Sequence, residues 1–514
     1  MPPAPEQKRP ELILPVVLPP GFDRDHTTFS AERCVDGQWV RWQNGRARKI
    51  GGYAAATVQP NGTARHLRVS WVGTTGYVHL FSEDTVSRMT LTSAGVLGAV
   101  TDRTPAGFTI SSNNNWQTAI LFDEASGANV LLAHCTDNLN DLGTGTSRPV
   151  YYGELSNTPV LTSTGHSIDG GICVLQPYLF LYGSGGEIQW SDANKPLNVG
   201  AAGGGDAGAD RITGSKIVRG YSTSDTEYVT GGGSGATGLF WSLDSLIAAR
   251  YVGGTAIFKF QTINDEEISV LSSNAIVRHE GVFFWPGVDQ FYMFDGKVKT
   301  LPNDSNLDWF FDNLDFTYRQ KVWATVNERY GEIWWHFPYQ GSTECSRALI
   351  FNVHETARTG KPVWYDSTIA RAAGDTPHVF RWPLWADTAD PATLYRHEVG
   401  TDAVDTAAVS TAINSYIVSP TVSFAEQNLN DWVLLKRVEH DIDQTGDMTL
   451  NVIGREYARS ADTTSGNYTV TSTTTKTDLI EQRRQMRLKW TSNTVGGDYV
   501  MGKNLLHIQQ GSGQ

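Results

Sequence analysis

Short runs in which aromatic and β-branched residues alternate with other residues recur along this chain. Four of them begin with a glycine and lead into a polar turn: residues 76–81, 186–192, 281–287 and 331–338. Period-two alternation of this kind is typical of half-buried strands, and a leading glycine suits a tight turn. A long chain that repeats one short antiparallel unit is usually a propeller, a sandwich array or a solenoid.

Further strands are predicted between these runs, and their spacing gives the size of the repeating unit. We expect them at residues 130–133, 174–182, 255–260, 291–294, 322–326, 348–353 and 394–399. The spacing fits four-stranded blades of roughly 40–50 residues. We therefore predict an all-β fold in which residues 54–410 form a β-propeller of about five to seven blades. Helix signals are scarce, and residues 242–251 and 303–313 are the two candidates.

The sequence patterns at the two ends of the chain differ from the pattern in the middle. Residues 1–25 hold seven prolines and predict an extended arm, and Asn44-Gly45 predicts a type I′ hairpin turn, so residues 1–53 are assigned to an arm and a hairpin. After residue 411 the alternating runs become longer. They predict a separate C-terminal β-sandwich or barrel over residues 411–514, with strands at 415–424, 431–443, 448–453, 467–475, 484–491 and 499–508.

The charge of the chain limits its partners. The formal net charge is −13, which argues against a general nucleic-acid binder, although an acidic surface would let DNA pass without sticking. The predicted hairpin is an exception because it gathers four basic residues: Arg41, Arg46, Arg48 and Lys49. They form either a solvated hairpin face or an electrostatic contact to another subunit or partner, and we take them as candidate assembly contacts.

Cysteine use and hydropathy indicate where the protein is made. Four cysteines lie far apart and never form a Cys-x-x-Cys pair, so we predict reduced, mostly buried thiols: Cys34, Cys135, Cys173 and Cys345. No segment has the ~18 apolar residues that a membrane-spanning helix needs, and the N-terminus lacks the order of a signal peptide. We expect a protein without a membrane span that is made in a reducing cytoplasm.

No motif for catalysis or for a cofactor stands out. Residues 167–171 supply only the first half of a sialidase-type Asp-box, and no second copy follows. Glu439, Asp441 and Asp443 alternate along one predicted strand, which favours a solvated face or a weak ion site over a catalytic pair. The chain has no Gly-x-Ser-x-Gly elbow, no His-Glu-x-x-His zinc motif and no P-loop. We therefore predict no enzyme, no catalytic residue, no cofactor and no metal site.

Three stretches of the chain resemble one known family. They are residues 40–53, residues 183–196, and residues 327–338 together with residues 345–352 and Trp364. These stretches resemble tail hub proteins of short-tailed bacteriophages, which are also called packaged-DNA stabilisation or nozzle proteins. The resemblance spans residues 30–400 in pattern and is weaker after residue 411.

The resemblance implies a structural protein of the virion tail. Such a subunit would be a β-propeller in a homohexameric ring below the portal and adaptor proteins, and it would continue the DNA conduit and retain the packaged genome until ejection. Its partners would be the portal and adaptor, tail fibre, tailspike or needle proteins, and double-stranded DNA that passes without sequence-specific binding, with assembly in the host cytoplasm. Two alternatives stay open: a carbohydrate-binding or carbohydrate-cleaving propeller of a phage tail, and a propeller scaffold of cellular origin.

Overall fold

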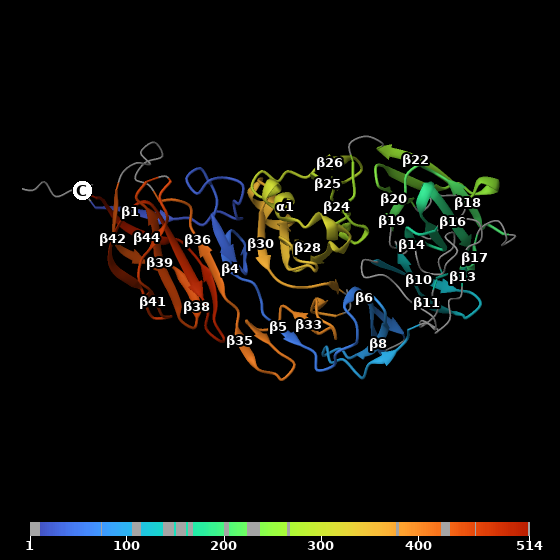
Figure 1. Cartoon of the computed structure of the whole chain (residues 1–514), viewed down its shortest axis with the longest axis horizontal. Coiled ribbons are helices and arrows are strands. Elements are labelled where there is room, and N and C mark those ends of the chain that lie inside the picture. The colour runs from blue at the N-terminus through green and yellow to red at the C-terminus, as the bar shows by residue number, and fades with distance from the viewer. Residues whose placement is uncertain are drawn as a thin grey trace, which may run out of the picture.

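The protein is built almost entirely from antiparallel strands (Figure 1). The computed structural model describes residues 11–72, 75–104, 115–136, 149–150, 161–162, 168–199, 205–223, 237–264, 268–376, 380–422, 432–457 and 459–511. Within these ranges the α-helices are α1 (Leu307–Asn313) and α2 (Val353–Thr359). The predicted all-β class is confirmed. Of the two predicted helices, the one at 303–313 contains α1, whereas the one at 242–251 is wrong because residues 246–251 form a strand.

Seven sheets follow one another along residues 53–412, and we call this region the sheet ring. Their strands, sheet by sheet, are β6 (Ala64–Val72), β7 (Thr75–Ser82), β8 (Val86–Leu91) and β9 (Thr101–Asp102); β10 (Asn115–Asp123) and β11 (Ala128–Thr136); β14 (Gly171–Leu175), β15 (Tyr178–Tyr182), β16 (Glu187–Asp192), β17 (Lys195–Val199) and β18 (Gly208–Arg211); β19 (Ile217–Ser222), β20 (Thr237–Ser242), β21 (Leu246–Tyr251) and β22 (Phe258–Asn264); β23 (Val277–His279), β24 (Val282–Pro286), β25 (Phe291–Phe294) and β26 (Val298–Thr300); β27 (Trp323–Asn327), β28 (Glu332–Phe337), β29 (Arg347–Asn352) and β30 (Trp364–Thr368); and β31 (Ala373–Asp375), β32 (Leu384–Ala386), β33 (Leu394–His397), β5 (Tyr53–Ala55), β34 (Asp402–Val404) and β35 (Ser410–Ala412). A separate pair, β12 (Pro149–Val150) and β13 (Leu161–Thr162), follows β11.

The first strands of these sheets contact one another in cyclic order. β6 contacts β10, β10 contacts β14, and β14 contacts β19. A 3-10 turn at Ser273–Ala275, just before β23, contacts both β19 and β27, and the order continues through β31 back to β6. The last sheet includes β5 from the start of the region, paired antiparallel with β33, so strands from both ends close the sequence of sheets. This order is consistent with the predicted propeller, which stays our interpretation of the sheet ring.

The C-terminal strands form two sheets that share one core with N-terminal strands. The larger sheet has nine strands: β1 (Leu12–Val16), β2 (Asp36–Gln38), β36 (Ser415–Val418), β37 (Val433–Glu439), β39 (Met448–Arg455), β40 (Thr463–Thr464), β41 (Tyr468–Val470), β42 (Lys476–Ser492) and β44 (Asn504–Gln510). The smaller sheet has four: β3 (Val40–Gln43), β4 (Arg46–Lys49), β43 (Asp498–Met501) and β38 (Ile442–Thr445). We call this unit the two-sheet domain.

The N-terminal residues therefore do not stand apart as an arm and a hairpin. β1 is an edge strand on β44, β2 pairs with β36, and β4 pairs with β43, so residues 12–49 complete the sheets of residues 415–510 (Figure 1, blue beside orange and red). Residues 1–10 of the predicted arm lie outside the described residues. The hairpin turn itself is confirmed, because Asn44 and Gly45 have φ angles of 52° and 76°, as a type I′ turn requires.

One hydrophobic core joins the two-sheet domain to the sheet ring. It contains Trp42 of β3 and Val433 of β37 together with Trp334, Tyr365 and Trp385 of the sixth and seventh sheets. We call this contact region the joint. The four cysteines are free and buried, as predicted. In the described part of the chain, no helix is long and apolar enough to span a bilayer.

Candidate functional site

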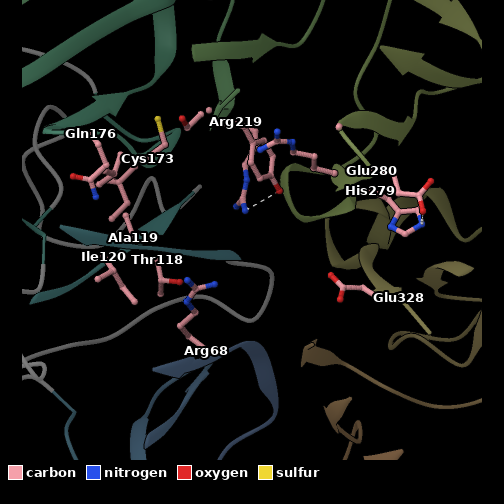
Figure 2. Close-up of a pocket in the computed structure, with 17 residues that line it drawn as sticks. Arg68, Thr118, Ala119, Ile120, Cys173, Gln176, Arg219, His279, Glu280 and Glu328 are labelled. Carbon is pink, nitrogen blue, oxygen red and sulfur yellow. Dashed lines mark hydrogen bonds and ion pairs between the residues drawn. The ribbon is translucent and has the colours of Figure 1, made fainter. Parts of the chain in front are cut away.

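A polar cavity lies where the first strands of the sheet ring converge. Its larger part has a volume of about 720 Å³ and is lined by β6, β10, β14, β19 and β23 (Figure 2). A smaller part of about 150 Å³ adds residues of β27 and β31, and Arg68, Arg219 and Tyr221 line both parts. Each of the seven sheets therefore contributes its first strand to the cavity.

Arg219 on β19 is a half-buried cation of the cavity. Its Nη2 donates a hydrogen bond of 3.1 Å to the Tyr221 hydroxyl, and its Nη1 donates one of 3.3 Å to Oδ1 of Asn274. The guanidinium also lies 4.8 Å from the centre of the Tyr221 ring, and its Nε is buried without a hydrogen-bond partner. Burial lowers the pKa of Arg219, but the contacts with Tyr221 and Tyr182 outweigh it and raise the pKa, so the side chain stays charged.

Arg68 on β6 faces the same space and has even fewer partners. Its Nε is buried without a hydrogen bond, and no residue in the described part of the chain forms an ion pair with it. No carboxylate among those residues contacts Arg219 either. Arg278 on β23 also lines the cavity and donates a hydrogen bond of 2.8 Å to the backbone oxygen of Thr223. Arg65 on β6 lines the smaller part, but it pairs with Glu83 and Glu344. The cavity thus collects positive charge inside a protein whose net charge is −13.

His66 reports the electrostatic effect of these arginines. Its Nε2 lies 3.0 Å from Oγ1 of Thr118, and its ring belongs to the lining of the smaller part. Burial, followed by the positive charges of Arg219 and Arg68, lowers the pKa of His66 to about 3. The imidazole is therefore neutral at pH 7. The same field that disfavours a proton on His66 would favour an oxyanion in the cavity.

The opposite rim of the cavity carries imidazoles and carboxylates. Figure 2 shows His279, Glu280 and Glu328 on the side away from Arg68 and Thr118. Nε2 of His354, on α2, lies 3.2 Å from Oε1 of Glu280. Burial lowers the pKa of His279, more than Glu280 raises it. Acidic and imidazole groups therefore gather on this side, where Arg278 also lines the cavity, and Arg68 lies on the other side.

The four basic residues that the hairpin suggested as assembly contacts have different surroundings. Arg41 and Lys49 are buried, and Lys49 Nζ donates a hydrogen bond of 2.8 Å to the backbone oxygen of Gly497. These two side chains are occupied within the chain, which corrects their assignment to an intersubunit contact. Arg46 is exposed, and Arg48 is half-buried with a 2.7 Å hydrogen bond to Gln43. For Arg46 and Arg48 the contact stays a prediction.

Arg41 is the centre of the joint. Its Nε and Nη2 donate hydrogen bonds of 2.8 Å each to the two carboxylate oxygens of Glu332, and Nη1 and Nη2 donate bonds of 2.9 and 2.5 Å to Glu398. The guanidinium lies 3.6 Å from the centre of the Tyr330 ring. Burial opposes the charge, but Glu332 and Glu398 raise the pKa of Arg41 well above its usual value. Glu332 also accepts hydrogen bonds from Trp334 Nε1 and the Tyr365 hydroxyl.

Three of the other acidic residues singled out from the sequence, Asp169, Glu439 and Asp441, have structural partners. Asp169 of the partial Asp-box accepts hydrogen bonds from the backbone N–H and hydroxyl of Ser184 and pairs with Lys216. Glu439 lies 2.8 Å from His507 Nε2, and Asp441 accepts a hydrogen bond from the backbone N–H of Lys503. Residues 163–167, which include the start of the Asp-box, lie outside the described residues. These contacts give Asp169, Glu439 and Asp441 a structural role.

The sequence did not point to the cavity. Its arginines are Arg65 and Arg68 on β6, Arg219 on β19 and Arg278 on β23, which lie on strands far apart in the sequence. The sequence signal for the cavity is that arginine recurs on the first strand of several sheets. This pattern can be recognised only after the strands have been assigned to sheets.

Comparison with known proteins identifies no family for this chain. No family model matches, and no curated protein matches. Among solved structures, an exo-β-1,3-galactanase from Phanerochaete chrysosporium in complex with β-1,3-galactotriose is 11% identical, with 88% of this chain and 100% of that chain covered and a TM-score of 0.30. The computationally designed Ika8 protein is 9% identical, with 67% and 100% covered and a TM-score of 0.36. Both TM-scores are too low to support a conclusion about fold or function.

Proposed function

We propose that this protein is a structural component of a bacteriophage tail, a hub or nozzle that assembles as a homohexameric ring and continues the DNA conduit. The observation that carries the proposal is that the family-like stretches meet in the fold. Arg41, from residues 40–53, forms a bidentate ion pair with Glu332, from residues 327–338. Asn352, at the end of residues 345–352, donates a hydrogen bond to the backbone oxygen of Trp42.

The role of these residues supports a structural function. Arg41, Trp42, Glu332 and Trp334 are all buried in the joint, where they hold the two-sheet domain against the sheet ring. A buried ion pair with complete hydrogen bonding fixes one relative arrangement of the parts that it connects. The recognisable residues thus maintain a rigid body, which is what a subunit of a tail conduit requires. In this proposal the protein resides in the virion tail and contacts portal, adaptor and fibre, tailspike or needle proteins.

The oligomeric state tests the proposal. The purified full-length chain should elute as a ring with about six times the 56.4 kDa mass of one chain, measured by light scattering, and should appear as a closed ring in negative-stain images. Arg46→Glu should shift the particle toward smaller species if the exposed end of the hairpin contacts a neighbour. A chain that stays monomeric at micromolar concentration, alone and with its neighbouring tail proteins, would refute the hub.

A second candidate is a carbohydrate-binding protein of a phage tail, and the cavity is the observation that favours it. A polar cavity lined by arginines, Tyr221 and Gln176 has the donors that would hold an acidic sugar. This function predicts a monomer or small oligomer that retains acidic polysaccharide on a column. Retention that disappears in Arg219→Met, without a hexameric ring, would favour this candidate over the hub.

A further inference from the structure

Three side chains that can ligate a metal lie together at the rim of the cavity. His279 is the last residue of β23, Glu280 follows it in the β23–β24 turn, and His354 is the second residue of α2. One ligand atom from each lies within 4.8 Å of the others. The cluster brings the fifth and sixth sheets together across 75 positions of the sequence.

The backbone around the cluster places each ligand. Glu280 and Gly281 have φ angles of 49° and 82°, so they form a two-residue turn that directs the Glu280 side chain away from the sheet beside His279. Gly331 has a φ of 62°, and a Cβ built there would lie 2.3 Å from Cγ of His354. The imidazole of His354 can therefore occupy its place only because residue 331 is a glycine.

His279 supplies the second observation that points to a ligand. Its side chain is 7% exposed, and its Nε2 is buried without a hydrogen-bond partner. The closest carboxylate oxygen, Oε1 of Glu280, is 4.0 Å away, which is too far for a hydrogen bond. A buried polar atom without a partner is unfavourable, so a ligand that accepts the Nε2 lone pair would remove this penalty.

The distances suit a small divalent ion. Ligands at about 2.0–2.2 Å from a tetrahedral zinc lie roughly 3–3.5 Å from one another. The His354 to Glu280 distance is 3.2 Å, and the wider His279 to Glu280 distance of 4.0 Å needs only a small movement of the outer ligands. Both outer side chains can move, since Glu280 is 61% and His354 is 45% exposed. Two imidazoles and one carboxylate form a donor set that divalent zinc accepts.

We propose that His279, Glu280 and His354 bind a divalent transition metal of the zinc class. Three protein ligands leave a fourth position open, and because His279 and Glu280 line the larger part of the cavity, that position can face the cavity. The ion would link the β23–β24 hairpin to the start of α2, and thereby the fifth sheet to the sixth. It would also add a positive charge to the rim that now carries Glu280 and Glu328. This site is independent of the proposed tail function.

Zinc titration of the metal-stripped full-length protein tests the proposal. Wild-type protein should bind one equivalent of Zn²⁺ by calorimetry and show a higher Tm with Zn²⁺ than with Mg²⁺. Both Glu280→Gln and His354→Ala should weaken zinc binding at least tenfold. Their positions are exposed, so we expect both variants to fold, which circular dichroism would verify. The matched control is His26→Ala, which removes an exposed histidine that pairs with a single carboxylate, Asp23, 3.0 Å away.

Cobalt provides a readout that nonspecific binding would not produce. Co²⁺ in a low-coordinate site with imidazole ligands should give visible absorption bands that disappear in His354→Ala and persist in His26→Ala. Zinc affinity that is equal in wild type, Glu280→Gln and His354→Ala would overturn the proposal. So would the absence of both zinc binding and cobalt bands in the wild-type protein.

Discussion

Arg41, buried in the joint, and Arg219, half-buried in the cavity, are two arginines with opposite electrostatic surroundings. Arg41 donates four hydrogen bonds to two carboxylates, and its charge is neutralised inside the chain. Arg219 has a tyrosine hydroxyl and an asparagine oxygen as partners, both of them neutral. The pKa of each arginine is raised, by Glu332 and Glu398 for Arg41 and by Tyr221 and Tyr182 for Arg219, in both cases against burial.

These surroundings distinguish an arginine whose charge stabilises the fold from an arginine whose charge is available to a ligand. An ion pair with complete hydrogen bonding contributes specificity to the fold and leaves nothing to bind a ligand. A cation that is desolvated without a counter-ion is costly to the fold and offers its charge to an anion that enters. Arginine therefore has two roles here, a structural one in the joint and a charge available to a ligand in the cavity. The presence or absence of neighbouring carboxylates determines the role.

Breaking the joint should give the largest effect. Arg41→Met leaves the buried Glu332 and the part-buried Glu398 without their cation, and breaking a buried pair typically costs about 3–5 kcal/mol. We expect the free energy of unfolding in urea to fall by this amount, or the two regions to unfold in separate transitions. Arg46→Met is the control, since that side chain is exposed and should change stability by less than about 0.5 kcal/mol. Equal unfolding curves for the two variants would show that the ion pair does not hold the joint.

Removing the cavity arginines should have a smaller effect, and its sign should depend on the anion present. In chloride, Arg68→Met/Arg219→Met should be as stable as wild type or more stable, because two cations without carboxylate partners are removed. Added phosphate should stabilise wild type more than the variant. At ten times its Kd, a bound anion contributes about 1.4 kcal/mol.

The comparison is made by thermal unfolding in chloride and phosphate at equal ionic strength. Arg250→Met, which removes an exposed arginine on β21, should respond to phosphate as wild type does. If the double variant gains as much stability from phosphate as Arg250→Met, the cavity does not bind the anion.

The stability of the protein at acidic pH should test the electrostatic surroundings of the cavity, because His66 lies beside its arginines. Its pKa is about 3 in the folded protein and about 6.5 when unfolded, so the unfolded state binds more protons between these values. The contribution of a neutral His66 to stability is complete above pH 6.5 and is lost as the pH falls toward 3. The loss has a slope of at most about 1.4 kcal/mol per pH unit, because a single group takes up one proton.

His66→Gln should flatten this dependence of the unfolding free energy on pH, and glutamine can still bond to Thr118. Arg68→Met/Arg219→Met should reduce the acid sensitivity in part, because two of the causes of the lowered pKa are removed. Superimposable pH profiles for wild type and His66→Gln would mean that His66 is not held neutral by its surroundings.

Local patterns in the sequence predicted the secondary-structure elements well. Alternation located β28 and most strands after residue 411, and Asn44-Gly45 located a hairpin turn, because side-chain alternation and backbone φ preferences act over a few residues. The helix expected at 242–251 failed for the opposite reason. Residues 246–251 pair with β20 on one side and β22 on the other, and this tertiary pairing outweighs local helix propensity.

The sequence by itself therefore determined the all-β class, the turns and the buried, reduced state of the cysteines. Only the tertiary structure decided that β1 completes the sheet of β44 and that β5 closes the last sheet beside β33. It also decided that Arg41 belongs to a joint, whereas Arg68 and Arg219 belong to a cavity. These outcomes depend on contacts between residues hundreds of positions apart, and neither alternation nor local charge carries information about which distant strands become neighbours.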